Sequence, residues 1–235
     1  MALQALSTIL DAHGGVDRWH EISQIDVEMS AHGFLFSTKH VPRQNHAHLS
    51  IDTRSPRTVI HDYPAAGLSG ILQGAGRVEV CDANGGIAEA REPARTEFDP
   101  RPWKHWDALN FAYFSGYAMW NYLTLPFLLL APGVEVQQVS ERRATVLDVR
   151  FPSDIPTHSE LQRLYFDAAG RLYRHDYTAE VVGGWARAIH LCSNYREFGG
   201  LQFPTTRRVY PRGPFGRPLS APTLVAIDIH DLDLS

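Results

Sequence analysis

The chain contains 235 residues, of which 44% are hydrophobic and 20% are charged, and its formal net charge is −4. These values are typical of a folded globular protein and exclude the disordered and fibrous classes. Lys and Arg residues form no cluster along the sequence, so neither nucleic acid nor an anionic membrane surface is an expected partner.

The length fits one all-β domain, so we expect a single domain over residues 1–235. The first residues, MALQALSTILDAHGG, lack a charged leader, a continuous apolar core and a cleavage site, so no signal peptide is expected. The apolar run over 111–130 is interrupted by Ser, Gly, Asn, Thr and Pro, which argues against integral membrane association. Two cysteines, Cys81 and Cys192, are too few for a secreted disulfide scaffold. The expected location is the cytoplasm.

Helical spacing marks the beginning of the chain. Residues 2–12 carry apolar side chains on one helical face, at Leu3, Leu6, Ile9 and Leu10. Gly14 and Gly15 then end the predicted helix, and a short second helix is predicted over 16–22.

The period changes to two from Gln24 onward. Ile25, Val27, Met29 and Ala31 alternate with polar residues, which predicts a strand with one face on a core. Further strands are predicted over 46–52, 57–63 and 77–82. The segment that contains Gly70, Gly74 and Gly76 is predicted to be a loop.

A long apolar helix is predicted over 105–123, after a Pro-rich and charged loop over 92–104. Its apolar residues lie on nearly every side, so the helix is either buried in the core or lines a pocket. Both roles are compatible, because pocket walls are mostly apolar and aromatic. We expect Tyr113, Tyr117 and Trp120 to contact a ligand.

The rest of the chain predicts consecutive antiparallel strands. They cover roughly 135–140, 143–151, 159–167, 171–181, 186–197, 203–211 and 223–231, with hairpin signals at residues 167–170 and 199–200. The predicted fold class is mainly β (α+β): a curled antiparallel sheet or incomplete β-barrel. An N-terminal helix and the central aromatic helix would close an apolar cavity.

Two segments resemble the LolA/LolB-type half-barrel, the fold of bacterial lipoprotein carriers. The first is ILDAHGGVDRW at 9–19, and the second is the hairpin YFDAAGRL at 165–172. The resemblance implies an incomplete antiparallel barrel whose open side is plugged by helices around an apolar cavity. That family acts outside the inner membrane and this chain shows neither an export signal nor a lipobox cysteine. The resemblance is therefore used for the fold and not for lipoprotein transport.

The strand over 171–181 suggests a pair of functional side chains. Tyr173, His175, Tyr177, Ala179 and Val181 alternate with polar residues and are predicted to face inward. On an apolar face, His175 can act as a base and Tyr177 as an acid or an orienting group. The alternative is that both are core residues whose polar atoms bond to the backbone.

For the strand over 186–196, we expect Ile189, Leu191, Ser193 and Tyr195 to face inward. The polar residues of the later strands would then form a stripe on the outer face, at Asp176, His190, Arg207, Asp228 and His230. If the sheet curls the other way, these groups line the cavity instead. Tyr173, Trp185 and Tyr195 complete the predicted ligand-binding residues.

No motif in the sequence indicates a metal or a cofactor. The chain has 12 histidines, among them His46, His48, His61 and His158, but no HExxH or CxxC spacing, so no metal site is predicted. No GxGxxG, phosphate loop or GxSxG elbow is present, so neither a nucleotide cofactor nor a serine nucleophile is expected.

The sequence leaves two main functional hypotheses. The first is a protein that binds a hydrophobic small molecule inside the half-barrel. The second is a cofactor-independent enzyme, such as an isomerase, cyclase or lyase, that uses acid–base chemistry on an apolar substrate in the same cavity. A metal-dependent hydrolase that uses some of the histidines is a third, weaker hypothesis.

Overall fold

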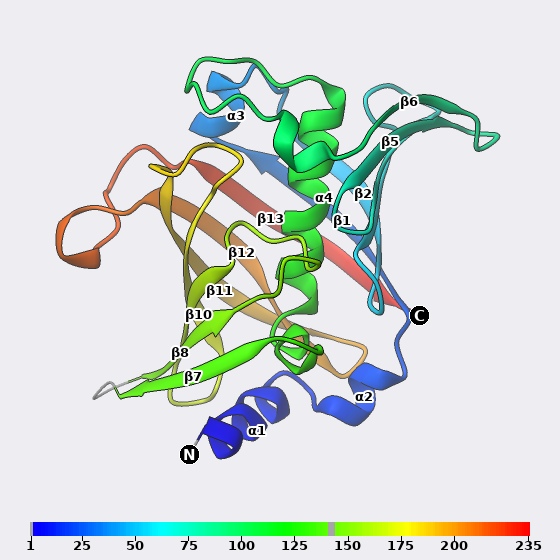
Figure 1. Cartoon of the computed structure of the whole chain (residues 1–235). Coiled ribbons are helices and arrows are strands. Elements are labelled where there is room, and N and C mark those ends of the chain that lie inside the picture. The colour runs from blue at the N-terminus through cyan, green and yellow to red at the C-terminus, as the bar shows by residue number, and fades with distance from the viewer. Residues whose placement is uncertain (1, 141–143) are drawn as a thin grey trace.

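The computed structural model describes residues 2–140 and 144–235 (Figure 1). Its first half contains α1 (Ala2–Ala12), α2 (Val16–His20), β1 (Gln24–His32), α3 (Phe34–Thr38), β2 (Gln44–Asp52), β3 (Arg57–His61), β4 (Leu68–Gln73), β5 (Arg77–Asp82) and β6 (Ile87–Arg91). Its second half contains the 3-10 turn η1 (Ala94–Glu97), α4 (Ala108–Thr124), η2 (Phe127–Leu130), β7 (Glu135–Ser140), β8 (Thr145–Arg150), β9 (Leu161–Phe166), β10 (Leu172–Thr178), β11 (Arg187–Phe198), β12 (Leu201–Pro211), η3 (Pro214–Gly216) and β13 (Val225–Leu234).

The thirteen strands of the described residues form one antiparallel sheet that is not closed into a barrel. The strand order is β6-β5-β4-β3-β2-β1-β13-β12-β11-β10-β9-β8-β7, so two meanders meet where β1 pairs with β13. At that junction, the Ser23 and Gln24 amides donate to the Ser235 carbonyl, at 2.6 Å and 2.8 Å. The predicted curled, incomplete half-barrel is confirmed.

Alternation along the strands places the core on the concave face of the sheet. In β1, residues Ile25, Val27, Met29 and Ala31 are all buried, whereas the residues between them are partly exposed. In β13, Val225, Ile227 and Ile229 are buried in the same way, as predicted. This apolar lining faces α4, which runs through the hollow of the sheet (Figure 1).

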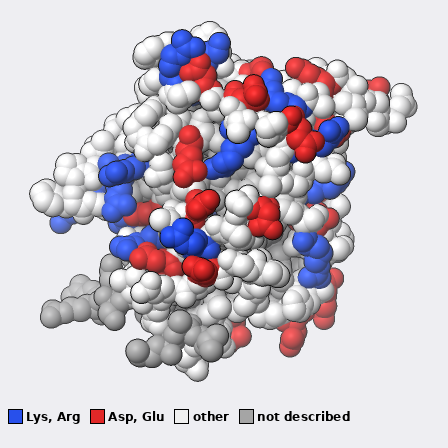
Figure 2. All heavy atoms as spheres, in the orientation of Figure 1, with Lys and Arg blue, Asp and Glu red and all other residues white. Residues whose placement is uncertain are grey.

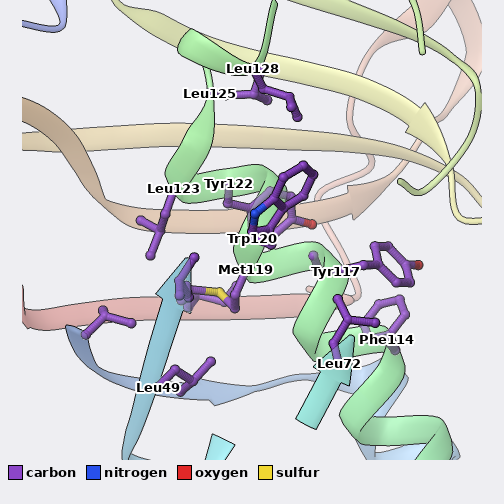
Figure 3. Close-up of a cluster of buried hydrophobic side chains, with 14 of the residues drawn as sticks. Leu49, Leu72, Phe114, Tyr117, Met119, Trp120, Tyr122, Leu123, Leu125 and Leu128 are labelled. Atoms are coloured by element: carbon purple, nitrogen blue, oxygen red, sulfur yellow. The ribbon is translucent and has the colours of Figure 1, made fainter. Parts of the chain in front are cut away.

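Helix α4 begins at a capping box, in which the Asn110 amide donates to the Asp107 carboxylate at 2.8 Å. Every residue from Leu109 to Thr124 is buried, which explains why the sequence shows no polar face. Figure 3 shows side chains of this helix packed between the strands and η2. Its close approach to the sheet depends on Gly116, because a Cβ atom there would lie 2.8 Å from the Leu72 Cβ.

The sequence-based prediction missed α3, β4 and β6, and it placed the start of α4 three residues too early. Strand β4 contains Gly70, which suggested a loop. A Cβ atom at Gly70 would lie 3.0 Å from the Ala112 Cβ, so the glycine lets α4 pack closely on this strand. Arg143, which the prediction included in a strand, lies outside the described residues.

Candidate ligand-binding site

A cavity of about 300 Å³ lies between α3, α4 and the concave face of the sheet. Its walls are mostly apolar, with Phe36, Phe114, Met119, Val209 and Ile227 among the lining side chains. This volume is at the lower end of the range for small-molecule pockets, about 300–1,000 Å³.

Two exposed aromatic residues lie at the opening of the cavity. Phe34 and Trp185 both line it, yet they are 53% and 60% exposed. Lys39, Arg187 and Arg212 also line the cavity. Among the described residues, no Asp or Glu lines it. Arg212 also lies 3.8 Å from the Asp176 carboxylate, which is outside the lining. The cavity therefore combines an apolar interior with basic side chains in its wall.

Three buried side chains with polar atoms also line the cavity, and we call them the polar floor: Tyr122, His158 and Tyr177. The Tyr122 hydroxyl hydrogen-bonds to His158 Nε2 at 2.6 Å and to the Tyr177 hydroxyl at 3.0 Å. The His158 and Tyr177 rings are stacked, with their centroids 4.0 Å apart. Behind them, Tyr117 bonds to His158 Nδ1 at 3.1 Å. Both nitrogens of His158 are thus held by tyrosine hydroxyls.

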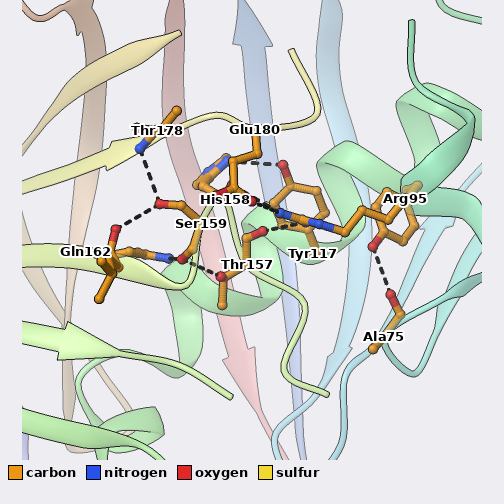
Figure 4. A network of polar contacts seen from close by, with 11 residues as sticks. Ala75, Arg95, Tyr117, Thr157, His158, Ser159, Gln162, Thr178 and Glu180 are labelled. Atoms are coloured by element: carbon orange, nitrogen blue, oxygen red, sulfur yellow. Dashed lines mark hydrogen bonds and ion pairs between the residues drawn. The ribbon is translucent and has the colours of Figure 1, made fainter. Parts of the chain in front are cut away.

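The segment that carries His158 is fixed by polar contacts on both sides (Figure 4). Arg95, in η1, donates to the Thr157 carbonyl at 2.7 Å and pairs with Glu180 at 2.7 Å. Asn121 of α4 donates to the Pro156 carbonyl at 2.6 Å. These contacts hold the His158 ring against the floor of the cavity.

A second group of side chains lies behind the polar floor, and we call it the inner layer: His175, His190, Cys192 and Arg207. Arg207 is 1% exposed; it donates to the Tyr122 carbonyl at 2.7 Å and to Cys192 Sγ at 3.4 Å. Its guanidinium lies 5.0 Å from the centroid of the Tyr122 ring. Tyr122 therefore separates the cavity from a buried cation.

Several nitrogens of the inner layer have no hydrogen-bond partner among the described residues. They are both ring nitrogens of His190, Nδ1 of His175 and Nε of Arg207. His175 Nε2 bonds to the Gln162 side chain. Buried polar atoms normally find partners, so this concentration of unpartnered donors and acceptors is unusual.

Burial keeps these groups neutral, apart from Arg207. Desolvation, assisted by the charge of Arg207, lowers the pKa of His175 to about 3 and the pKa of His190 well below 6.5. Desolvation also lowers the pKa of His158 well below its usual value, with smaller contributions from His175 and Arg95. The pKa of the Tyr177 phenol is raised well above 10 by burial. At neutral pH, the floor contains a neutral imidazole and protonated phenols.

Of the eight predicted site residues, Tyr177 and Trp185 line the cavity. His175 lies behind Tyr177, with the two ring centroids 4.9 Å apart. The other predicted tyrosines and Trp120 lie outside the lining. Tyr113, Trp120 and Tyr195 donate to the carbonyls of Ala75, Asp52 and Leu172, respectively. Tyr117 hydrogen-bonds to His158.

The predicted inward orientation is wrong for Tyr173, which is 38% exposed. The pairing of β10 with β9 shifts register between Leu172 and Arg174, so strict alternation is lost at this position. Leu172 is buried instead.

The predicted faces are also inverted in β11. His190 pairs directly with His175, and directly paired residues point to the same face, so His190 and Cys192 face inward. Arg207 pairs directly with Cys192, so it also faces inward. The predicted outer stripe is therefore divided: Asp176, Asp228 and His230 remain on the outer face, whereas His190 and Arg207 belong to the interior. The prediction placed Ile189 on the inner face because it is apolar, but Ile189 is buried on the outer face of the sheet.

The sequence did not identify His158, Tyr122 or Arg207 as members of one site. A usable signal existed, because a helix that is apolar all round and rich in tyrosine must find buried partners for its hydroxyl groups. Within residues 2–140 and 144–235, no group of three or more His, Cys, Asp or Glu side chains is arranged to hold a metal ion. In the same residues, no helix is both long enough and apolar enough to span a membrane.

No family model and no curated protein sequence matches this chain. Among solved structures, the chain is similar to a LolA superfamily protein from Nitrosomonas europaea, with a TM-score of 0.54, 10% identity and coverage of 100% of this chain and 94% of the other. It is also similar to a DUF1329 family protein from Desulfovibrio piger, with a TM-score of 0.53, 12% identity and coverage of 99% and 92%. The fold is therefore LolA-like, as the two short sequence motifs predicted.

Proposed function

We propose that this protein binds an apolar small molecule in the cavity between α3, α4 and the sheet. The observation that carries the proposal is a hollow of about 300 Å³ with mostly apolar walls. An unfilled apolar volume is unfavourable, because the lining atoms lack contacts that a close-packed interior would supply. A bound apolar ligand would restore those contacts. The LolA-like fold, which lipoprotein carriers share, agrees with this function.

The opening of the cavity supports the same proposal. Phe34 and Trp185 are exposed beside it, and large aromatic side chains on a surface often mark binding sites. They offer an apolar surface to a ligand that leaves water and enters the cavity.

The test is a substitution that fills the cavity, Ala118→Phe, because Ala118 of α4 is buried and lines the hollow. Binding is measured by titration with the neutral fluorescent probe N-phenyl-1-naphthylamine. We expect saturable binding by the native chain and at least about a tenfold loss in Ala118→Phe, with unchanged circular dichroism. The control is Ala66→Phe, in an exposed loop, which should bind like the native chain. Equal binding by both variants would overturn the proposal.

A second candidate function is acid–base catalysis on the bound molecule without a cofactor. Its supporting observation is the neutral His158 between the hydroxyls of Tyr117 and Tyr122. A proton could pass from His158 to the cavity through Tyr122 and Tyr177, and Tyr177 would be the group that touches the substrate. In this arrangement, His158 takes the role that the sequence suggested for His175.

The substitution His158→Gln separates the two functions. A binding protein should keep its affinity for the probe within a fewfold. An enzyme should lose turnover of its substrate by about 10²-fold or more.

A further inference from the structure

The hydrogen bonds of the polar floor leave one donor without an acceptor. Tyr117, His158, Tyr122 and Tyr177 form a linear chain joined by three hydrogen bonds. A neutral imidazole carries one N–H, so the three hydroxyls and the imidazole supply four hydrogens for these three bonds. When Tyr122 accepts one of these bonds and donates the other, one hydroxyl hydrogen is left without an acceptor among the described residues, at either the Tyr117 end or the Tyr177 end.

The surroundings of the two ends favour the Tyr177 end. Tyr117 is 0% exposed, so a hydrogen left over there would be buried without an acceptor. Tyr177 lines the cavity, where a ligand can supply the acceptor. His158 then donates to Tyr122, and Tyr122 donates to Tyr177.

The charges around the cavity indicate an acceptor that is an anion. Arg207 lies directly behind Tyr122 and, within the described part of the chain, has no carboxylate partner. Buried guanidinium groups are normally paired with an acid. Lys39 lines the cavity, is 0% exposed and donates to the Arg101 carbonyl at 3.0 Å. A ligand with a negative charge would balance this excess of buried positive charge.

We propose that the ligand is an amphiphile with one carboxylate group, which accepts the hydrogen of the Tyr177 hydroxyl while its apolar chain fills the cavity. This inference rests on the proposed binding function and adds the chemical class of the ligand. The carboxylate end lies at the polar floor, and the chain extends toward Phe34 and Trp185 at the opening.

Three probes of the same chain length test the inference on the native protein: decanoate, methyl decanoate and decylammonium. Each displaces N-phenyl-1-naphthylamine in a competition titration at pH 7.5. We expect decanoate to bind at least about tenfold more tightly than the ester, because a hydrogen bond to a charged group is stronger than one to a neutral carbonyl. The ammonium should bind most weakly, because Arg207 and Lys39 repel it.

The variant Tyr177→Phe removes the donor and keeps the ring. It should reduce the preference for decanoate over the ester by about tenfold. The matched control is Tyr210→Phe, on the outward face of β12, which should keep the full preference.

The outcomes separate this inference from the proposed function. If the neutral probe binds but decanoate and the ester compete equally, the ligand class is wrong and the binding function stands. The same holds if the ammonium binds as well as decanoate, or if Tyr177→Phe keeps the full preference. If none of the probes binds, the binding function fails and this inference fails with it.

Discussion

Tyr122 is the residue that connects the cavity to the buried cation behind it. Its hydroxyl contacts His158 and Tyr177, its ring faces Arg207, and its carbonyl accepts a hydrogen bond from the same arginine. The ring also meets the His190 ring edge to face, with centroids 4.6 Å apart. A change in the charge of Arg207 would therefore reach the cavity through this side chain.

The buried histidines predict that stability falls in mild acid. His158, His175 and His190 are neutral in the folded state because burial lowers each pKa below 6.5, to about 3 for His175. The unfolded chain takes up these protons near pH 6.5, so below that pH the unfolded state binds more protons and stability rises with pH. For His175 alone, we expect the free energy of unfolding to drop by about 1.4 kcal/mol per pH unit between pH 6 and pH 4, and His158 and His190 add to this loss.

Urea unfolding at pH 7.5, 6.0 and 5.0 measures this dependence. The variant His190→Phe removes one of the three sites, so its stability should fall less steeply below pH 6 than that of the native chain. A slope that is unchanged in His190→Phe would contradict a neutral, buried His190.

At the residue scale, alternation within β10 was enough to place His175 and Tyr177 in the interior. It could not place His158, because that residue lies in a connection between β8 and β9 whose path is fixed by Arg95 and Asn121. Those contacts join residues far apart in the sequence, and no local pattern records them.

At the scale of elements, α4 determines where the interior is solid and where it is hollow. On one face, α4 packs against β3, β4 and β5 (Figure 3). The Thr58 hydroxyl donates to the Gly116 carbonyl at 3.0 Å, which fixes the helix against β3. On the side of α3, the helix stands away from the sheet and leaves the cavity.

The substitution Gly116→Ala should therefore destabilise the protein. Alanine favours an isolated helix over glycine by about 1 kcal/mol. Here its Cβ atom would lie 2.8 Å from the Leu72 Cβ, and such overpacking costs about 1–3 kcal/mol. Because relief of this contact requires α4 and β4 to move apart, we expect the cost of overpacking to exceed the gain in helix preference. Urea unfolding measures the resulting loss of stability.

The control for this prediction is Gly76→Ala. A Cβ atom at Gly76 meets no other atom within 4 Å, so its effect should stay within about 0.5 kcal/mol. A gain in stability for Gly116→Ala would show that α4 can move away from β4 at little cost.

Elements with a strong period were predictable, and those shaped by close packing were not. Strand β1 alternates over its full length, and its position was predicted within one residue. Strand β4 carries Gly70 where α4 approaches, and β6 is exposed along most of its length, so neither shows the alternation of a half-buried strand. Helix α3, with five residues, is too short to show a period.

At the scale of the whole molecule, the charges form no single-sign field on the face shown in Figure 2. Blue and red side chains are interspersed over this face, as expected from a net charge of −4 spread over the chain. Lys39 and Arg207 lie at or behind the cavity, where low polarity strengthens the effect of their charge on a ligand.

Because both meanders and α4 surround the cavity, ligand binding should stabilise the fold as a unit. A ligand at a concentration of 100 times its Kd stabilises the folded state by about 2.7 kcal/mol. We expect the thermal unfolding midpoint, followed by tryptophan fluorescence, to rise with probe concentration. A saturated binding signal with an unchanged midpoint would place the probe outside the folded cavity.

The LolA-like half-barrel was predictable from two short motifs and the order of the elements. The position of the junction between β1 and β13 was not, because it pairs strands from opposite ends of the chain and local periodicity carries no information on such pairs.

Strand β13 comes after the other twelve strands of the described residues, yet it lies inside the sheet between β1 and β12. During translation, both meanders therefore emerge from the ribosome before the strand that unites them. Until then, the free edges of β1 and β12 expose unpaired amides and carbonyls to other nascent strands. Loss of β13 would consequently split the molecule into two open sheets, whereas loss of β6 would only shorten one margin.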